Sequence, residues 1–299
     1  MKILYISDLD GTLLNSNAEV SDFTRKTLNK LIADGMHFCI ATARTSATVS
    51  KMFESININM PVILMNGVCI FDLKKNTYIK IESIPTISKT AMIKTLKKYN
   101  LSGFLYTIDE NHLSTFYENT DSPNAKAFIE ERVKKFNKSF TKVSDFADCL
   151  NKNIVYYSIS EKKEKLESLY TELAMDKNLH IEFYRDIYNE DFWYLEVCSN
   201  TASKYNAVNF LRKKYGYEKV ISFGDNLNDL PLFLASDECY SVKNAKQEVK
   251  VEATGIIDSN NDDGVPKWLQ NHADGIMFRI ICQAVSALSA AYTFHKSRT

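Results

Sequence analysis

Short apolar runs alternate with amphipathic helical segments near both ends of this chain. Before residue 84, apolar runs at residues 2–7, 36–42 and 61–66 have the length and composition of buried strands, and helical segments separate them. Strands that are joined through helices run parallel, and a parallel sheet buries both of its faces under helices. The alternation therefore predicts an α/β fold whose core is a Rossmann-like, doubly wound parallel sheet.

The middle of the chain has a different order of elements. From residue 84 to 190 we expect helix, two strands, helix, strand, helix and strand, which is typical of a mixed α+β unit. The α/β alternation resumes with an apolar run at residues 192–197. We therefore predict a discontinuous core, residues 1–83 and 191–272, with an α+β cap domain, residues 84–190, inserted into it.

The composition indicates a folded protein with a small-molecule partner. Apolar residues make up 45% of the 299 residues and charged residues 25%, and 37 basic side chains balance 37 acidic ones. This neutral balance gives no electrostatic reason to expect nucleic acid or an anionic membrane surface as the partner. Six cysteines without a CxxC pair, and no basic-then-apolar leader at the start, favour a cytoplasmic location.

The last residues, 273–299, form an apolar tail with a helical pattern. Along one face of a helix lie Met277, Ile281, Ala284, Leu288 and Ala291. This pattern favours an amphipathic helix that docks on the protein body or on a second copy, so we expect a monomer or a homodimer. Two alternatives stay open, namely a membrane span and a segment that is not native to the fold.

Polar side chains gather in four fragments, each at or near the C-terminal end of a predicted strand. In an open α/β sheet these ends form the ligand crevice. A threonine or lysine taken singly at such a position is usually structural or solvated, so the combination carries the argument. The fragments contribute Asp8, Asp10, Gly11 and Thr12, then Thr42 and Arg44, then Lys204, and finally Asp225, Asn228 and Asp229.

The carboxylates in these fragments indicate a magnesium site. Asp8, Asp10 and Asp225 would bring like charges together, which is costly unless a cation neutralises them. Carboxylate oxygens favour Mg²⁺, which shares its coordination between protein, waters and a substrate phosphate. Calcium of the EF-hand type is disfavoured, because the segment DLDGT lacks the twelve-residue ligand pattern.

Two acids this close at a strand end suit phosphoryl transfer. Asp8 is the candidate nucleophile, which would form an aspartyl-phosphate. Asp10 is the candidate general acid toward the leaving group and then the base toward water. The hydroxyl of Thr42, the ammonium of Lys204 and backbone amides near Gly11 are candidates for neutralising the phosphate oxygens.

The four fragments resemble the four motifs of the haloacid dehalogenase superfamily, in the same order. DLDGT resembles the first motif, Thr42 in IATAR the second, Lys204 in SK the third and GDNLNDLPLF the fourth. These segments, with MNG at 65–67, are most similar to the Cof-like sugar-phosphatase branch, whose members carry a large α+β cap of type C2 between the second and third motifs. The resemblance covers residues 1–272 and implies such a cap at residues 84–190.

The resemblance also implies roles for individual residues. Asp8 would be the nucleophile and Asp10 the acid/base, and Thr42 and Lys204 would hold the phosphate. Asp8, the main-chain carbonyl of Asp10 and Asp225 would bind Mg²⁺. Asn228 and Asp229 complete the expected metal site, and further candidates for phosphate or substrate contact are Gly11, Ala43, Arg44, Asn66 and Asn228. The branch often has glycine where Ala43 stands, a departure that adds only a methyl group.

Together these observations favour a Mg²⁺-dependent phosphomonoester hydrolase that acts on small phosphorylated metabolites, with sugar phosphates as the expected class. Two alternatives stay open: a phosphomutase that uses the same intermediate, and a non-catalytic binding protein that retains the fold. Nothing in the cap region identifies the substrate. Tyr184, Phe192 and Trp193 are candidates for lining a sugar or ring site, although packing within the strands is the commoner role for such aromatics.

Overall fold

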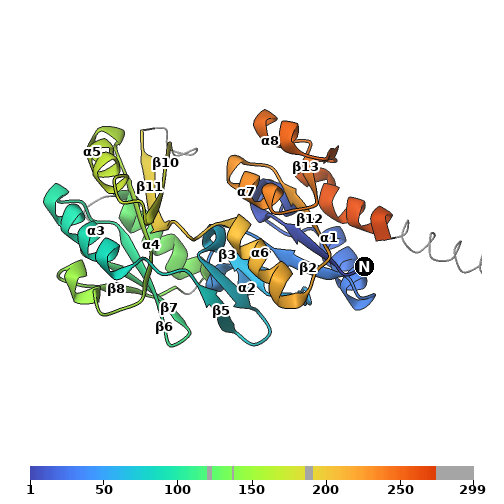
Figure 1. Ribbon diagram of the computed structural model, residues 1–299, viewed down its shortest axis with the longest axis horizontal. Coiled ribbons are helices and arrows are strands. Elements are labelled where there is room, and N and C mark those ends of the chain that lie inside the picture. Colours follow the sequence, from blue (N-terminus) through green and yellow to red (C-terminus); the bar gives the residue numbers. More distant parts are fainter. Residues whose placement is uncertain (120–122, 137, 186–190, 274–299) are drawn as a thin grey trace, which may run out of the picture.

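The computed structural model describes residues 1–119, 123–136, 138–185 and 191–273 (Figure 1). It contains a parallel five-stranded sheet, a six-stranded sheet and a short three-stranded sheet. In Figure 1 the parallel sheet and its helices lie at one end of the molecule, and the six-stranded sheet with its helices lies at the other. The expected α/β core with an additional α+β unit is therefore confirmed.

The core sheet is parallel throughout, as the alternation of strands and helices predicts. Its strand order is β14-β13-β12-β1-β2, so strands from the two ends of the chain lie side by side at its centre. The strands are β1 (Ile3–Ser7), β2 (His37–Ile40), β12 (Lys219–Gly224), β13 (Glu238–Val242) and β14 (Gly255–Ile257).

Helices cover both faces of this sheet. On one face Tyr5 and Phe38 belong to the same buried cluster as Leu28, and on the other face Leu4 packs with Val208. Each fully buried apolar side chain of this size contributes roughly 1.5–3 kcal/mol. The first face carries α1 (Asp22–Ala33), α2 (Ser46–Met52) and the helix at residues 264–273; the second carries α6 (Lys204–Tyr215), α7 (Leu230–Leu234) and α8 (Gln247–Glu252).

A three-stranded antiparallel sheet continues the core beyond β2. It consists of β3 (Val62–Leu64), β4 (Cys69–Asp72) and β5 (Thr77–Ile81), and Ala41 forms an isolated parallel bridge to Ile63. The turn between β3 and β4 needs left-handed backbone at Asn66 (φ 54°) and Gly67 (φ 101°). A side chain at Gly67 would place a Cβ 2.2 Å from the carbonyl oxygen of Ser203, so the turn packs tightly against the start of α6.

The six-stranded sheet is mostly antiparallel, with the order β10-β11-β9-β6-β7-β8. Its strands are β6 (Phe104–Asp109), β7 (His112–Tyr117), β8 (Phe140–Lys142), β9 (Ile154–Glu161), β10 (Leu179–Arg185) and β11 (Trp193–Ser199). Helices α3 (Thr86–Tyr99) and α5 (Lys163–Leu173) pack on one face. Helix α4 (Pro123–Phe136) packs against β6 on the opposite face, where Phe128 lies beside Phe104.

Strand β11 corrects one expectation from the sequence. The run at 192–197 was expected to begin the second half of the parallel core at residue 191, but β11 pairs antiparallel with β9 and β10. The physical reason is its alternation: Leu195 and Val197 are buried against α3 and α5, whereas Tyr194 and Glu196 point to the other face. The chain therefore returns to the parallel core only at α6.

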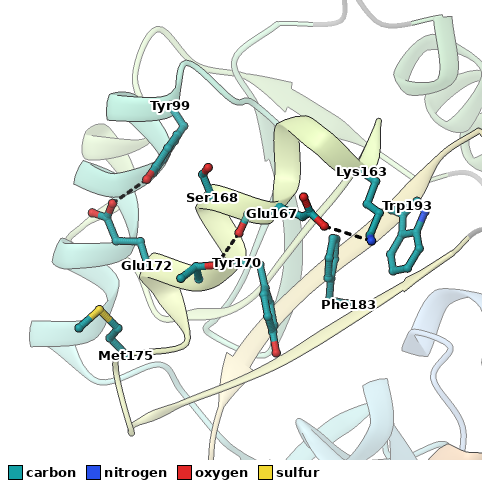
Figure 2. A pocket seen from close by; sticks show the side chains of 10 residues that line it. Tyr99, Lys163, Glu167, Ser168, Tyr170, Glu172, Met175, Phe183 and Trp193 are labelled. Carbon is teal, nitrogen blue, oxygen red and sulfur yellow. Dashed lines mark hydrogen bonds and ion pairs between the residues drawn. The ribbon is translucent and has the colours of Figure 1, made fainter.

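A groove of about 870 Å³ lies on the side of the six-stranded sheet that carries α5 (Figure 2). Phe183 stacks on Tyr170 with ring centroids 5.0 Å apart and lies 4.8 Å from the ring of Trp193. The ammonium of Lys163 sits 4.9 Å from the Trp193 ring. Trp193 therefore lies on this outer side, whereas Tyr184 occupies the opposite face.

Within the described part of the chain, we find no helix with the length and apolar character needed to cross a membrane. The tail expected to form an amphipathic helix lies outside the described residues, except for Ala273.

Candidate active site

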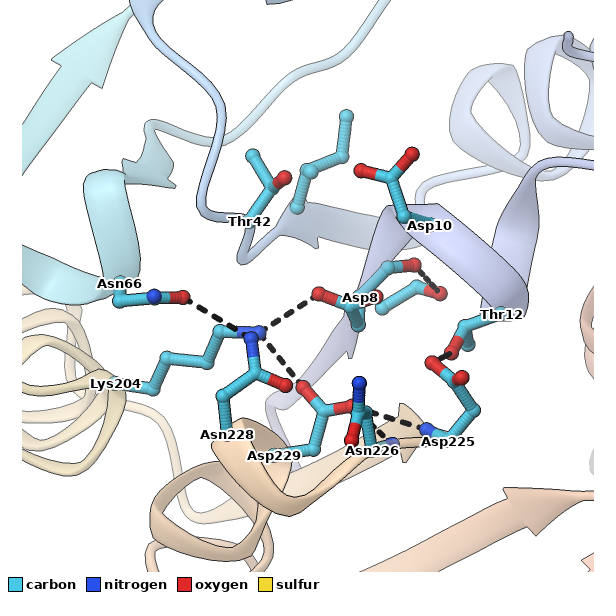
Figure 3. Close-up of polar contacts among 12 residues, drawn as sticks. Asp8, Asp10, Thr12, Thr42, Asn66, Lys204, Asp225, Asn226, Asn228 and Asp229 are labelled. Atoms are coloured by element: carbon cyan, nitrogen blue, oxygen red, sulfur yellow. Dashed lines mark hydrogen bonds and ion pairs between the residues drawn. The ribbon is translucent and has the colours of Figure 1, made fainter. Parts of the chain in front are cut away.

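The polar fragments predicted from the sequence meet at one edge of the core sheet (Figure 3). Asp8 directly follows β1, Thr42 lies just past β2, Asn66 follows β3, and Asp225 directly follows β12. Because these strands run in the same direction, their C-terminal ends lie along the same edge. The structure thus brings together residues that lie far apart in the sequence.

Lys204 joins two of the carboxylates from the buried first turn of α6. Its side chain is only 1% exposed, and its Nζ lies 2.7 Å from Oδ1 of Asp8 and 2.6 Å from Oδ1 of Asp229. Burial lowers the pKa of Lys204, but the charges of Asp229 and Asp8 outweigh burial and raise it above its usual value. Lys204 is therefore a permanent buried cation between two acids.

The start of α6 is fixed by local interactions that hold Lys204 in place. Ser203 has extended backbone, and its hydroxyl accepts a hydrogen bond from the backbone N–H of Asn206 at 3.0 Å, as expected for an N-cap. A cation in the first turn opposes the helix dipole, so the two carboxylates must offset that cost. The position of Lys204 thus makes sense only together with its acidic partners.

The segment GDNLND forms a short turn that aims Asp229 back at the site. Asn226 and Asp229 form a reciprocal capping box, in which Oδ2 of Asp229 accepts from the backbone N–H of Asn226 at 3.1 Å. The same oxygen accepts from the backbone N–H of Asp225 at 3.0 Å. Both oxygens of the Asp229 carboxylate are therefore occupied, one by Lys204 and one by backbone amides.

Asp8 is the most buried acid that lacks full compensation. Its side chain is 7% exposed. Burial, followed by the negative charge of Asp229, raises the pKa of Asp8 well above its usual value, whereas Lys204 lowers it. Its Oδ1 accepts from Lys204, and among the described residues its Oδ2 accepts no hydrogen bond. One carboxylate oxygen at the end of β1 is thus available for chemistry.

Asp225 faces Asp8 across a turn that only glycine fits. The Thr12 hydroxyl donates to Oδ1 of Asp225 at 2.9 Å, and burial raises the pKa of Asp225 to about 6. Gly11 has a φ of 78°, and a Cβ there would lie 2.5 Å from Oδ2 of Asp225. The glycine of DLDGT therefore allows the first and last acidic fragments to approach each other closely.

The carboxylates fit a hard divalent cation. One oxygen each from Asp8, Asp225 and Asp229 lies within 4.8 Å of the others. Asp8 and Asp225 each retain an oxygen without a hydrogen bond from the described residues, and burial, followed by the negative charge of Asp229, raises the pKa of both. Asp229 lies in the cluster, but its oxygens are already bonded, which suits support of Lys204 better than direct ligation.

Asp10 points away from this cluster and pairs with Arg44. Nε and Nη2 of Arg44 lie 2.8 Å and 2.6 Å from the two carboxylate oxygens of Asp10, which forms a bidentate ion pair. The Asp10 side chain is 52% exposed, on the open side of the site (Figure 3). Its carboxylate is thus directed to Arg44 and solvent rather than to the cluster of Asp8, Asp225 and Asp229.

The remaining predicted residues lie around the same site, with Thr42 beside Asp10 and with Asn66 and Asn228 near Lys204 (Figure 3). Thr42 is buried, and its hydroxyl accepts from the backbone N–H of Arg44 at 3.2 Å. Asn228 Nδ2 donates to Asn66 Oδ1 at 3.3 Å. Ala43 is exposed and, unlike Asn66, has no positive φ, so alanine in place of glycine brings no backbone strain.

Two supporting contacts were missed in the sequence. Asn244 Nδ2 donates to the carbonyl oxygen of Gly11 at 2.8 Å, and the backbone N–H of Lys246 donates to the carbonyl oxygen of Asp225 at 2.9 Å. Both residues follow β13, a neighbour of β12 in the same parallel sheet. The strand-end rule that located the other fragments would have located Asn244 as well.

Comparison with known proteins agrees with this geometry. A family model described as haloacid dehalogenase-like hydrolase matches residues 5–269. The pyridoxal phosphate phosphatase YbhA of Escherichia coli (strain K12) is 21% identical over 271 residues, which cover 89% of this chain and 96% of that protein. The 5-amino-6-(5-phospho-D-ribitylamino)uracil phosphatase YitU of Bacillus subtilis (strain 168) is 22% identical over 271 residues, with coverages of 89% and 95%.

Solved structures show the same fold. A haloacid dehalogenase-like hydrolase from Bacteroides thetaiotaomicron has a TM-score of 0.74 at 22% identity, covering 91% of this chain and 99% of that one. The family match spans all three sheets described above and all four acidic and polar fragments. The chain therefore belongs to the haloacid dehalogenase-like hydrolase family.

Proposed function

We propose that this protein is a Mg²⁺-dependent phosphomonoester hydrolase of small phosphorylated metabolites, with sugar phosphates as the expected class, that works through an aspartyl-phosphate. The observation that carries the proposal is the arrangement of Asp8. Its carboxylate is held by the buried Lys204, faces Asp225 and keeps one oxygen without a hydrogen bond from the described residues. A fixed, partly compensated carboxylate at a strand end suits nucleophilic attack on phosphorus.

The side chains around Asp8 divide the work of phosphoryl transfer. Asp8 would attack the phosphorus, while the Lys204 ammonium and the Thr42 hydroxyl neutralise and orient the phosphate oxygens. Lys204 is bonded to Asp8 and so would hold nucleophile and phosphate in one geometry. Mg²⁺, held by Asp8, Asp225 and the main-chain carbonyl of Asp10, would supply charge neutralisation to the same phosphate.

Asp10 would transfer the protons. Its carboxylate lies on the open side of the site, where the leaving group of a phosphate ester would depart. It would give a proton to the leaving oxygen and later take one from the water that hydrolyses the aspartyl-phosphate. Arg44 orients the Asp10 carboxylate through two hydrogen bonds, so we assign Arg44 a positioning role in place of the expected substrate contact.

The relatives support the class of substrate. YbhA is named as a phosphatase of pyridoxal phosphate and YitU as a phosphatase of a ribitylaminouracil phosphate. Both are small phosphorylated compounds, which agrees with the neutral charge balance of this chain. A phosphomutase and a non-catalytic binding protein remain the alternatives. The presence of both Asp8 and Asp10 in the site argues against the second of these.

The test is the substitution Asp8→Asn in the full chain with Mg²⁺ present. We expect release of inorganic phosphate from an aryl phosphate to fall on the order of 10⁴-fold or more, because the nucleophile is lost. Asp34→Asn, an exposed residue after α1, is the matched control and should retain activity. Activity that persists in Asp8→Asn contradicts the nucleophile assignment. Isomerisation of a sugar phosphate without phosphate release by the wild type would favour the phosphomutase.

A further inference from the structure

Over β9, β10 and β11, the face of the six-stranded sheet opposite α3 and α5 carries polar and aromatic side chains. We call it the inward face and define it by Tyr156, Glu182, Tyr184, Tyr194 and Glu196. These side chains share a face because Glu182 is paired opposite Glu196, and Tyr184 opposite Tyr194, between β10 and β11. The outward face, by contrast, buries Leu195 and Val197 under α3 and α5.

Two glutamates opposite each other are not explained by the stability of the sheet. Like charges at directly opposed positions on neighbouring strands are destabilising. Nε2 of His180 lies 3.5 Å from Oε1 of Glu182. Burial, rather than a counter-charge, dominates at Glu196, raising the pKa of its carboxyl to about 7. The fold thus maintains a costly pair of acids on this face.

Hydroxyl groups and rings surround the two acids. The hydroxyls of Tyr156 and Tyr184 form hydrogen bonds with the Glu196 carboxylate. Tyr184 stacks on Tyr194 with centroids 5.6 Å apart, and Tyr184 is 42% exposed. Ser160 is paired opposite Tyr194, and its buried Oγ has no hydrogen-bond partner among the described residues. The face therefore offers ring surfaces, acceptors and one unsatisfied hydroxyl.

Helix α4 connects this face to the catalytic crevice. The pKa of Glu131 on α4 is lowered by a hydrogen bond from Lys135 and also by the charges of Arg132 and Arg44. Lys51 of α2 also donates to the carbonyl oxygen of Lys135 at 2.7 Å. Helix α4 is thus held against α2, whose Met52 contacts the guanidinium of Arg44.

The other side of α4 faces the acids on the sheet. Burial and then the charge of Glu196 raise the pKa of Tyr106, and the charge of Arg132 lowers it, so these three side chains are neighbours. Tyr106 also contacts Tyr156 edge to face at 5.8 Å. Helix α4 therefore packs against α2 of the core and against the same side of the six-stranded sheet that carries the inward face.

We propose that the inward face is the leaving-group subsite, and that it selects phosphomonoesters whose alcohol part carries several hydroxyl or amino donors and rejects those that carry a carboxylate. This inference rests on the proposed phosphatase function. The assigned determinants are Glu182 and Glu196, with the rings of Tyr184 and Tyr194 as a packing surface.

The chemistry of the side chains sets this preference. An ionised carboxylate only accepts hydrogen bonds, so two of them are matched by ligand O–H or N–H groups. A ligand carboxylate would face two like charges and would leave them unpaired or repelled. Tyrosine rings pack against the C–H faces of a sugar or polyol while their hydroxyls stay polar. Selection thus follows from one attractive and one repulsive element at the same site.

A matched set of substrates tests this preference. Glucosamine 6-phosphate, glucose 6-phosphate and 6-phosphogluconate share a six-carbon phosphate ester and differ in an amine, a hydroxyl or a carboxylate. At pH 8 we expect kcat/KM for the first two to exceed that for 6-phosphogluconate by about 10-fold or more. In the double variant Glu182→Gln, Glu196→Gln this ratio should fall below about threefold. Glu167→Gln on the outward side of α5 is the control and should keep the wild-type ratio.

Two further measurements separate this proposal from the proposed function. Wild-type turnover of an aryl phosphate reports on the phosphatase alone. Binding of the three sugar phosphates to Asp8→Asn with Mg²⁺, measured by calorimetry, reports on the subsite without turnover. In Asp8→Asn we expect glucosamine 6-phosphate and glucose 6-phosphate to bind more tightly than 6-phosphogluconate. In the triple variant Asp8→Asn, Glu182→Gln, Glu196→Gln this difference in affinity should be lost. Equal affinities in Asp8→Asn, a wild-type preference for the carboxylate, or an unchanged ratio in the double variant would overturn the subsite.

Discussion

The catalytic crevice and the inward face of the six-stranded sheet both collect carboxylates, but they stabilise them in opposite ways. In the crevice, Asp8 and Asp229 share a buried lysine at 2.7 Å and 2.6 Å. On the inward face, Glu196 lies opposite Glu182 and is hydrogen-bonded by neutral tyrosines. In the crevice a buried cation therefore stabilises the carboxylates, whereas on the inward face their burial costs free energy.

This difference separates two kinds of functional site. The crevice is a preorganised centre in which the Lys204 ammonium is already oriented between two carboxylates, as phosphoryl transfer requires. On the inward face the acids are partnered by tyrosine hydroxyls and His180, which leaves acceptor capacity for a ligand, as a specificity surface requires. Removing a charge should therefore lower the free energy of unfolding when the charge lies in the crevice and raise it when the charge lies on the inward face.

The largest effect is expected for Lys204→Met, which keeps the volume of the side chain but removes its charge. Two buried carboxylates lose their cation, so we expect the free energy of unfolding to fall by about 3–5 kcal/mol. Phosphatase activity should fall on the order of 10³-fold, because the nucleophile and the phosphate lose the same positioning group. Denaturant unfolding and steady-state kinetics measure the two effects.

Lys213→Met on the exposed side of the same helix is the control for the change of residue type. It should alter the free energy of unfolding by less than about 0.5 kcal/mol. Adding Mg²⁺ should recover part of the stability lost in Lys204→Met, since a cation then returns to the acids. A Lys204→Met variant as stable as the wild type without Mg²⁺ would show that charge does not hold the crevice together.

The crevice was largely predictable because parallel strands end at a common edge. Asp8, Thr42, Lys204 and Asp225 were found from strand ends and motif spacing, and the structure brings them together. The partner of Arg44 was not predictable, because a rotamer decides whether its guanidinium reaches Asp10 or the substrate. The short elements β8, α8 and β14 were missed, since three to six residues are too few to show a period.

The inward face was not predictable from sequence for a different reason. Its members come from β9, β10 and β11, and only the register of antiparallel pairing places Glu182 opposite Glu196. A shift by one residue would turn both acids to the outward face. The run at 192–197 was also assigned to the parallel core, so β11 was not considered beside β10. Tertiary pairing, which no local pattern encodes, creates this surface.

A smaller effect is expected for Gly11→Ala, which tests whether close approach of the acids in the crevice matters. The new Cβ would meet Oδ2 of Asp225 at 2.5 Å and would require left-handed backbone at a φ of 78°. We expect a loss of about 1–3 kcal/mol in stability and a weaker Mg²⁺ response, because Asp225 must move. Mg²⁺ titrations of activity and denaturant unfolding measure these changes.

Gly35→Ala separates the two causes, because Gly35 also has a positive φ, 98°, but nothing lies within 4 Å of the new Cβ. It should lose stability through backbone strain alone and keep the wild-type dependence on Mg²⁺. If Gly11→Ala and Gly35→Ala behave alike in both measurements, close packing of Gly11 on Asp225 has no role in the crevice.

The smallest effect, and the one of opposite sign, is expected for Glu196→Gln on the inward face. The pKa of Glu196 is raised from its usual value of 4.5 to about 7, so the folded protein binds a proton more tightly than the unfolded chain. Stability from this group is complete below pH 4.5 and is lost as the pH rises through 7. The groups that face it are Glu182, Tyr156, Tyr184 and Tyr106, with Arg132 of α4.

Glu196→Gln removes this titration, so its stability should fall less than that of the wild type between pH 5 and 8. Between these pH values we expect the free energy of unfolding of the variant, relative to that of the wild type, to increase by about 1–3 kcal/mol. Denaturant unfolding at both pH values measures it, and Glu167→Gln on the outward side should follow the wild type. A Glu196→Gln variant that loses stability relative to the wild type as the pH rises would mean that the inward face holds its acids by charge, as the crevice does.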